Sequence, residues 1–400
     1  MLHSNECSSV TCKNMAPLVV AMSSERPLII HTEHSRGWGG QEIRVLEELC
    51  GMRRLGYDVA LVSPRQSEIY KRAEAETIQV YAIDFGIKTS LLSSWKLFRL
   101  FSQLKPSVVN THSSDDSWLA GLVAKVLRVP LIIRTRHISV PISSTFSYRY
   151  FPHLILTTSK AIREDIIKLG IDDRKIISVP TGIDTDRFKY SPEKRETIRQ
   201  AYGISAQDIV IGNMCVFRSW KGLDFFVDTA AVMNAPFKFM LVGDGPHYER
   251  LKKKVQSIGL EKSVIFTGYQ EHVEEFCSAL DIFFFTSYAG EGVSQALLQA
   301  LCLGMPLVSC DIPPAVETLD GFDDYILVQY GDTTAAKKAI GEMTENIKNV
   351  ESRVAARSEL FHSRHSIESM LGKLVVCYKR YGIIKNHIKV KPGNIISGQL

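Results

Sequence analysis

The sequence predicts an α/β protein made of two doubly wound, Rossmann-like domains that face each other across a cleft. Short apolar runs alternate with segments of helical period from Pro27 onward, which is the pattern of a parallel sheet wrapped by helices. The pattern begins again at Ile209, after a polar stretch at 184–199. The length of 400 residues exceeds what one hydrophobic core usually supports, so two domains are the simplest division.

The first series of strands is predicted from runs rich in Val, Ile and Leu that end at polar or turn-forming residues. These runs are 28–32, 59–62, 79–82, 107–110, 131–134 and 154–158. The second series follows a turn at 203–205, and its runs are 209–213, 239–242, 264–267, 281–285 and 306–309. Helices are expected between the strands, where apolar residues recur with helical spacing.

The two series of strands divide the chain into two domains, with a leader before them and a tail after them. We expect a leader at 1–26, a first Rossmann-like domain at 27–190, a second at 191–365, and a C-terminal helix and tail at 366–400 that returns to the first domain. The leader contains an apolar run at 16–22 that is too short to span a membrane and lacks the basic flank of a signal peptide.

Composition bears on the compartment and on the partners. The eight cysteines are scattered without a CxxC spacing, which favours a reducing cytoplasm over a disulfide framework or a zinc site. The net charge of +5 is uneven, with 25 Lys and Arg against 19 Asp and Glu in residues 1–190 and 23 against 24 in the remainder. This bias can attract an anionic partner, but it is equally compatible with an ordinary solvated surface. The chain has no basic stripe or stacking motif, so nucleic-acid binding is disfavoured.

A binding site is predicted where the run 281–286 ends. Glu291 and Gly292 follow it, and the segment from Val293 onward should be helical, so the amides near Gly292, Val293 and Ser294 face the strand end as an anion site. Glu291 would repel phosphate and is better suited to accept hydrogen bonds from neutral hydroxyls. A phosphate site beside a polyol site suggests a nucleotide sugar.

Two cations follow the first strand of the second series. Arg218 and Lys221 bracket the start of the next helix, where a guanidinium fork and an ammonium charge suit a diphosphate without a metal ion. A solvated basic loop is the alternative. Asp184-Thr185-Asp186 has the form of a DxD metal motif, but it lies in the interdomain connection and we predict no metal site there.

The first strand of the chain ends in a loop with two adjacent glycines. Gly39 and Gly40 allow the backbone to approach a ligand, although a tight strand-to-helix turn would also need small residues. The loop lacks G-x-G-x-x-G, and Val62-Ser63-Pro64 stands where an acid would bind ribose, so an NAD site is disfavoured.

Polar side chains also follow two later strands of the first series. His112 is expected in the cleft, where it can donate to a sugar hydroxyl, with a structural histidine satisfied by the backbone as the alternative. At the next strand end, Arg134, Arg136 and His137 are predicted to bind the phosphates or carboxylates of an acceptor.

Taken together, these residues resemble the GT-B glycosyltransferases of family 4, a large retaining group that uses nucleotide-activated sugars. The resemblance covers nearly the whole chain from Pro27 to about Tyr381. Its motifs, which are specific in combination, are Gly39-Gly40, Thr158-Ser159-Lys160, Val179-Pro180-Thr181-Gly182-Ile183-Asp184, Arg218 with Lys221-Gly222, Val242-Gly243-Asp244-Gly245-Pro246 and Glu291-Gly292.

The resemblance implies a role for each site residue. Arg218 and Lys221 would grip the diphosphate, Glu291 would bind hydroxyls of the donor sugar, and His112 would lie beside the reacting sugar; these four form the implied catalytic set. The remaining implied donor contacts are Gly39, Gly40, Tyr269 beside the nucleobase, and the amides of Gly292, Val293 and Ser294. The family commonly has a second glutamate eight positions after the first, where it binds ribose hydroxyls, and Gln299 stands there in this chain.

The implied activity is transfer of a sugar from a nucleotide-sugar donor, with UDP favoured, to a glycan or lipid-linked acceptor with retention of anomeric configuration. Such reactions serve the biosynthesis of cell-surface polysaccharide or lipopolysaccharide, and no cofactor is expected. Two alternatives remain. One is a catalytically silent GT-B subunit that binds a nucleotide sugar, which Gln299 motivates, and the other is a sugar-nucleotide epimerase on the same fold.

Two segments indicate a peripheral contact with an anionic membrane. Residues 91–105 combine large apolar side chains with Lys96, Arg99 and Lys105, and residues 146–151 interleave aromatic side chains with Arg149. The alternative for the first segment is a helix packed on its own sheet. The expected location is the cytoplasm, with a peripheral contact on the inner face of the cell membrane.

Overall fold

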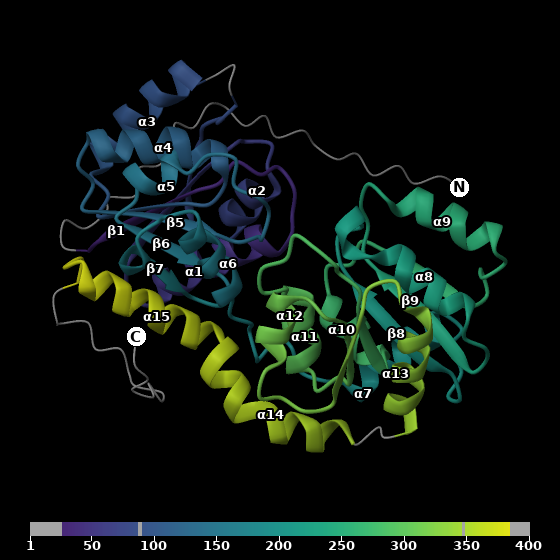
Figure 1. Cartoon of the computed structure of the whole chain (residues 1–400). Helices are drawn as coiled ribbons and strands as arrows, with labels where there is room; N and C mark the ends of the chain where they lie inside the picture. Colours follow the sequence, from purple (N-terminus) through teal and green to yellow (C-terminus); the bar gives the residue numbers. More distant parts are fainter. Residues whose placement is uncertain (1–25, 87–89, 346–348, 385–400) are drawn as a thin grey trace, which may run out of the picture.

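The computed structural model describes residues 26–86, 90–345 and 349–384, and in it the chain forms two α/β units (Figure 1). The predicted leader before Arg26 and the tail beyond residue 384 lie outside the described residues. None of the helices in the described part of the chain has both the length and the apolar composition that a membrane span needs.

Each unit is built on a parallel sheet whose strand order reverses direction near its middle. The first sheet has the order β3-β2-β1-β4-β5-β6-β7 and the second has the order β10-β9-β8-β11-β12-β13. The strands are β1 (Leu28–Thr32), β2 (Asp58–Ser63), β3 (Gln79–Ala82), β4 (Val108–Thr111), β5 (Leu131–Arg136), β6 (Leu154–Thr157), β7 (Ile176–Ser178), β8 (Ile209–Met214), β9 (Phe237–Val242), β10 (Val264–Gly268), β11 (Ile282–Phe285), β12 (Leu307–Cys310) and β13 (Tyr325–Val328). The order reverses between β1 and β4 in the first sheet and between β8 and β11 in the second.

Helices connect successive strands and cover both faces of the sheets. In the first unit they are α1 (Gly40–Arg54), α2 (Glu68–Ala75), α3 (Ser90–Leu104), α4 (Ser114–Val126), α5 (Phe146–Tyr150), α6 (Lys160–Lys168) and the 3-10 turn η2 (Asp173–Lys175). In the second unit they are α7 (Pro192–Ala201), η3 (Ser219–Lys221), α8 (Leu223–Ala231), α9 (Tyr248–Ser257), α10 (Val273–Ala279), α11 (Gln295–Cys302), α12 (Pro313–Leu319), α13 (Thr333–Glu345) and α14 (Val350–His365), and α15 (Ile367–Arg380) ends the described chain.

All the predicted strands are present, with ends that differ by one or two residues. The prediction missed β7 and β13, which are short and lie at the outer edges of the two sheets. An edge position alone does not account for this, because β3 and β10 lie at the opposite edges of the two sheets and were predicted. The helix expected from Val293 begins two residues later, at Gln295, because Ser294 takes an extended N-cap conformation with φ −73° and ψ 122°.

The first sheet is packed on both faces. Ile29 belongs to the buried cluster that includes α1 and α15, whereas its neighbour Ile30 belongs to a second cluster with Leu97 and Phe101 of α3. Because successive residues of a strand point to opposite faces, a strand buried on both faces must be apolar at nearly every position. This explains why the strands could be found as continuous apolar runs.

The chain crosses between the two units twice, and the two crossings are hydrogen-bonded to each other. The amide of Ile183 donates to the carbonyl of His365 at 2.7 Å, and the amide of Ile367 donates to the carbonyl of Ile183 at 3.2 Å. A Cβ added to Gly182 would lie 2.7 Å from Cα of Ile367, so only glycine permits this close approach. Figure 1 shows α14 along the second unit and α15 continuing onto the first, where α15 completes a buried cluster.

Candidate functional site

The predicted site residues lie at the points where the strand order of each sheet reverses. In the second unit, the loop after β8 carries Arg218 and Lys221, and the loop after β11 carries Glu291. In the first unit, His112 follows β4 and His137 follows β5. Crevices at such switch points are where open α/β sheets bind ligands, because the loops on either side diverge.

Lys221 and Glu291 form an ion pair across the switch point of the second unit. The Lys221 ammonium donates to Oε1 of Glu291 at 2.5 Å, and the two side chains are only 19% and 8% exposed. Burial lowers the pKa of Lys221, but the attraction of Glu291 outweighs it and the pKa is raised overall. Lys221, the predicted diphosphate contact, is therefore hydrogen-bonded to Glu291, the predicted acceptor for sugar hydroxyls. An incoming diphosphate would compete with Glu291 for the ammonium group.

The loop that carries Lys221 is held against the end of β11. Gly222 has a left-handed conformation, and a Cβ there would lie 2.0 Å from the carbonyl oxygen of Thr286. The hydroxyl of Thr286 donates to the carbonyl of Lys221 at 2.8 Å. The guanidinium of Arg218 lies over the ring of Trp220 at 5.3 Å from its centroid. These contacts fix the two cations in one loop beside Glu291.

Glu291 and the start of α11 contact the first unit directly. The amide of Ser139 donates to the carbonyl of Glu291 at 3.3 Å. A Cβ added to Gly292 would lie 2.1 Å from the carbonyl oxygen of His137 and 2.3 Å from Oγ1 of Thr158. Val293 and Ser294, which complete the predicted anion site, are buried beside these contacts.

Helix α11, which follows Glu291, also contacts the Gly39-Gly40 loop of the first unit. Nε2 of Gln295 donates to the carbonyl of Gly40 at 3.0 Å, and a Cβ on Gly40 would lie 3.4 Å from Cγ of Gln295. Gln299, one turn further along α11, is buried. The structure thus brings Gly40, His137 and the Glu291 loop together between the two units.

In the first unit, three buried histidines form a chain of hydrogen-bonded rings. Nδ1 of His31 lies 2.9 Å from Nε2 of His112, and Nδ1 of His112 lies 2.9 Å from Nε2 of His137. Burial is the main cause that lowers the pKa of all three, to about 4 for His31 and well below the usual value for His112 and His137. We expected His112 to donate to a sugar hydroxyl, but both its ring nitrogens already face imidazoles.

Acidic side chains surround the glycine loop. Glu33 is fully buried and accepts hydrogen bonds from Ser113 and Gln41, each at 2.6 Å. Burial, followed by the negative charges of Asp116 and Glu42, raises the pKa of Glu33. Since these carboxyl groups lie beside the loop that contains Gly39 and Gly40, the surroundings are less suited to a diphosphate than to the hydroxyls of a neutral ligand.

The structure places Arg134, one of the predicted acceptor residues, inside the first unit. Arg134 is buried, and its guanidinium lies over the ring of Tyr148 at 3.5 Å from the centroid and donates to Ser147. The predicted acceptor contact of Arg134 is therefore corrected to a contact within the first unit, because its strand position points it beneath α5. Arg136, two residues later, donates to the carbonyl of Val140 in the following loop.

Tyr269 takes part in a cluster that joins the two units. Arg72 of α2 donates to both carboxylate oxygens of Glu271, at 2.6 and 2.8 Å, and to the hydroxyl of Tyr269 at 3.0 Å. The hydrogen bond from Arg72 lowers the pKa of Glu271 to about 2. Arg72 also lies over the ring of Trp38, 4.4 Å from its centroid. The expected nucleobase contact of Tyr269 would therefore have to form beside this cluster.

Sequence reasoning missed several residues that line or join the site. His31 reads as part of an apolar strand, and Gln295 and Ser139 carry no motif. Glu317 of α12 accepts from the amide of Lys160 at 2.8 Å, at the start of α6 in the other unit. The sequence analysis identified Lys160 as part of the motif Thr158-Ser159-Lys160. It could not identify Glu317, because no local pattern marks a partner so far away in the sequence.

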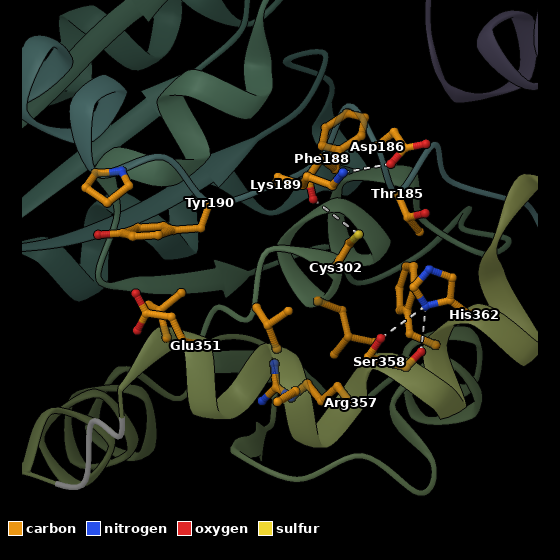
Figure 2. A pocket seen from close by; sticks show the side chains of 16 residues that line it. Thr185, Asp186, Phe188, Lys189, Tyr190, Cys302, Glu351, Arg357, Ser358 and His362 are labelled. Atoms are coloured by element: carbon orange, nitrogen blue, oxygen red, sulfur yellow. Dashed lines mark hydrogen bonds and ion pairs between the residues drawn. The ribbon is translucent and has the colours of Figure 1, made fainter.

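The structure also contains a cavity of about 590 Å³ away from these residues. Figure 2 shows its walls, formed by residues 185–192 of the connection, the end of α11 and one side of α14. Within it, Cys302 donates to the carbonyl of Phe188 at 3.4 Å, and His362 contacts Ser358. The cavity therefore adjoins the interdomain crossings and takes no part in the cleft.

Two sequence families match the chain. The family described as Glycosyltransferase Family 4 matches residues 38–187, and the family described as Glycosyl transferases group 1 matches residues 208–346. Together the two matches cover more than half of the chain.

Similar curated proteins and solved structures fall in the same class. The chain is 27% identical over 280 residues to the 2-deoxystreptamine N-acetyl-D-glucosaminyltransferase of Streptomyces fradiae, an alignment that covers 63% of this chain and 66% of that enzyme, just under two thirds of its length. It is 24% identical over 272 residues to the UDP-Gal:alpha-D-GlcNAc-diphosphoundecaprenol alpha-1,3-galactosyltransferase of Escherichia coli, covering 62% of this chain and 69% of that enzyme. The crystal structure of Anabaena HepE in complex with UDP and glucose has the same fold, with a TM-score of 0.79 at 18% identity over 88% of this chain and 99% of HepE.

Proposed function

Because the chain belongs to the family 4 glycosyltransferases of the GT-B fold, we propose that it transfers a sugar from a nucleotide-sugar donor to a hydroxyl group of an acceptor. The observation that carries this proposal is the buried Lys221–Glu291 pair, whose neighbour Gly292 lies against the His137 loop of the first unit. One side offers charge for a diphosphate and the other offers imidazoles and carboxyl groups for hydroxyls.

The donor is proposed to be a UDP-sugar bound mainly by the second unit. Arg218 and Lys221 hold the diphosphate, and the amides around Gly292, Val293 and Ser294 approach its distal phosphate. The name of the E. coli relative includes UDP-Gal, and the Anabaena structure holds UDP and glucose, which supports this choice of nucleotide.

The proposed reaction retains the anomeric configuration. The bond from the anomeric carbon to the diphosphate breaks, an acceptor oxygen bonds to that carbon from the same face, and the acceptor's proton passes to the departing phosphate oxygen. Arg218 and Lys221 stabilise the charge that develops on the leaving group, and closure of the two units aligns donor and acceptor. We propose no enzyme nucleophile and no metal ion, since the two cations supply the positive charge.

The acceptor is proposed to be a glycan or a lipid-linked sugar. The E. coli relative is named for an acceptor linked to diphosphoundecaprenol, which supports the lipid-linked class. The neutral histidines and the buried carboxyl groups of the first unit are suited to sugar hydroxyls on the acceptor side of the cleft. Because the described cysteines are unpaired, a cytoplasmic location is proposed.

We further propose that α3, α4 and α5 rest on an anionic membrane, where a lipid-linked acceptor would be found. Residues 90–150 contain eight Lys and Arg against two Asp and Glu. Large apolar side chains are exposed on these helices, namely Leu91, Leu92, Trp95, Phe98, Trp118, Leu122, Val126, Phe146 and Tyr150. Helix α3 also packs on the first sheet through Leu97 and Phe101, so the two alternatives for this segment describe opposite faces of one helix (Figure 1).

A thermal-shift screen tests the donor. Addition of UDP-, GDP- and ADP-sugars is expected to raise the melting temperature most for a UDP-sugar, because a ligand that binds only the folded state stabilises it by mass action. Release of UDP on addition of acceptor extracts then separates an enzyme from a silent binding subunit. No shift with any nucleotide sugar would contradict the proposed donor site.

A flotation assay tests the membrane contact. The full chain is expected to float with vesicles that contain anionic lipid, and the double variant Leu91→Ser, Trp95→Ser is expected to lose this binding. The matched control is Ile258→Ser, which removes an exposed apolar side chain from the second unit. Equal flotation of both variants would show that Leu91 and Trp95 do not make the membrane contact, and no flotation of the wild-type chain would argue for a soluble acceptor.

A further inference from the structure

The three-histidine chain belongs to the proposed acceptor side of the site, but its inner ring, His31, is fully buried and both nitrogens of His112 face other imidazoles. His31 lies within β1, His112 follows β4 and His137 follows β5. The rings of His31 and His112 are stacked with centroids 5.0 Å apart, and those of His112 and His137 are 5.1 Å apart. All three are buried, with exposures of 0%, 5% and 7% in that order.

The two ends of the histidine chain differ in their surroundings. At the inner end, Nε2 of His31 is buried and has no partner within the described part of the protein. At the outer end, Nδ1 of His137 has no protein partner among the described residues, and it is not one of the buried atoms sealed from solvent. The backbone of His137 borders Gly292 of the other unit, so this end of the histidine chain lies where the two units meet.

A neutral imidazole carries one ring proton, and each nitrogen–nitrogen contact needs one donor and one acceptor. The three tautomers are therefore linked. If every ring is protonated at Nδ1, His31 donates to His112, His112 donates to His137, and His137 donates into the cleft. If every ring is protonated at Nε2, all the directions reverse and the buried Nε2–H of His31 has no acceptor.

The inner end selects between these two states. A buried N–H without an acceptor is rarer in proteins than a buried acceptor without a donor, so the state with Nδ1 protonated on every ring is favoured. The charges of Glu48 and Arg44 act on His31 in opposite directions, and the two groups are paired with each other at 2.7 Å. Among the described residues, Oε2 of Glu48 and Nη2 of Arg44 are both buried without a partner, one an acceptor and the other a donor, so this pair does not select a tautomer.

We propose that His31 is a positioning residue that fixes the tautomers of His112 and His137, so that Nδ1–H of His137 is the hydrogen-bond donor presented to a sugar hydroxyl in the cleft. His31 itself touches no ligand. The identity of the ligand rests on the proposed glycosyl transfer, whereas the tautomer order is a property of the protein alone.

The primary test is ¹⁵N NMR of the full chain labelled at histidine, which needs no substrate. At about pH 7, the wild-type signals of these three rings should each show one neutral tautomer with the proton at Nδ1. Signals are assigned with the single substitutions His31→Asn, His112→Gln and His137→Asn. A mixture of tautomers, or protonation at Nε2, would overturn the proposal whether or not the protein proves to be a glycosyltransferase.

A matched pair of amides tests the positioning role. His31→Asn places an amide donor near the position of Nδ1 and can still donate to His112, whereas His31→Gln places its amide near Nε2 and cannot. Once a donor sugar has been found by the thermal-shift screen, His31→Gln should lower kcat for that UDP-sugar about ten-fold with little change in KM, and His31→Asn should restore most of it.

Two results would contradict the positioning role while leaving the proposed transfer intact. One is an equal loss in both amide variants, which would indicate only that His31 fills space. The other is unchanged kcat in a folded His31→Gln protein. Melting curves of both variants show whether each is folded, and the wild-type NMR measurement remains decisive if either is not.

Discussion

Lys221 donates to Glu291 across the switch point of the second unit, although the two residues are 70 positions apart in the chain. The pair links the cation proposed to hold the leaving diphosphate with the carboxylate proposed to bind the donor sugar. Both side chains are mostly buried, so the strength of the contact is little reduced by solvent. Entry of a donor must redistribute these hydrogen bonds, which makes the pair the most direct point at which to test the proposed site.

Lys221→Ala should lower kcat by an order of magnitude or more, because loss of one preorganised charge contact costs about 2 to 4 kcal/mol of transition-state stabilisation in other enzymes. Steady-state rates with the donor found in the screen measure the effect. Lys253→Ala, which removes an exposed lysine from α9 of the same unit, serves as the control and should leave the rate unchanged. Equal rates for Lys221→Ala and the wild type would remove the proposed leaving-group role.

Gly292→Ala should impair activity without unfolding either unit. Gly292 has no positive φ that alanine would resist, but its added Cβ would meet His137 and Thr158 of the other unit at 2.1 and 2.3 Å. The two units must therefore separate, and we expect a loss in kcat/KM of about ten-fold or more. Gly341→Ala is the matched control, since it lies in α13 with open space around it and should stabilise the helix by up to about 1 kcal/mol. Normal activity of Gly292→Ala would show that this contact is not needed for catalysis.

Arg72→Ala should weaken closure of the units and leave the fold intact. The Arg72–Glu271 pair joins the units, but its side chains are 29% and 51% exposed, so its contribution is at most about 1 kcal/mol and falls with added salt. The donor KM is expected to rise by no more than about five-fold, with no further rise in the Arg72→Ala, Glu271→Ala double variant. Arg250→Ala breaks a comparable pair with Asp224 inside the second unit and should not change KM. If it raised KM as much as Arg72→Ala, the effect could not be assigned to closure.

Glu33→Gln should stabilise the protein more as the pH rises. Burial raises the pKa of Glu33 in the folded state, so the folded chain holds a proton that the unfolded chain has lost, and stability falls with increasing pH in that range. Glutamine removes this dependence, and its advantage in unfolding free energy should grow by roughly 1 kcal/mol per pH unit from about pH 5 to 8. Urea unfolding at several pH values measures it. A difference between Glu33→Gln and the wild type that does not vary with pH would rule out a raised pKa for Glu33.

Gln299→Glu should tighten donor binding. The resemblance to family 4 places a carboxylate here against the ribose, and a carboxylate can accept from both hydroxyls, whereas the glutamine amide accepts through one oxygen. We expect about ten-fold tighter binding of UDP, read by calorimetry. Weaker binding would indicate that this buried position has adapted to the neutral amide.

The two series of parallel strands, and the loops that follow them, could be predicted from local sequence alone. Strands buried on both faces must be apolar along their length, and this is a local property that can be read without knowing any contact. Arg218 and Lys221 could be placed together for the same reason, since they share one short loop. The edge strands β7 and β13 were missed, and α11 begins later than expected because Ser294 is extended.

Which distant side chains meet depends on how the chain folds in three dimensions. His31, His112 and His137 become one hydrogen-bonded chain because the strand order places β1 beside β4 and β4 beside β5. Arg134 turns beneath α5 and not into the cleft because alternate residues of a strand face opposite sides of the sheet. Contacts between residues far apart in sequence depend on strand order and on how the two units pack, and neither is encoded in any local pattern.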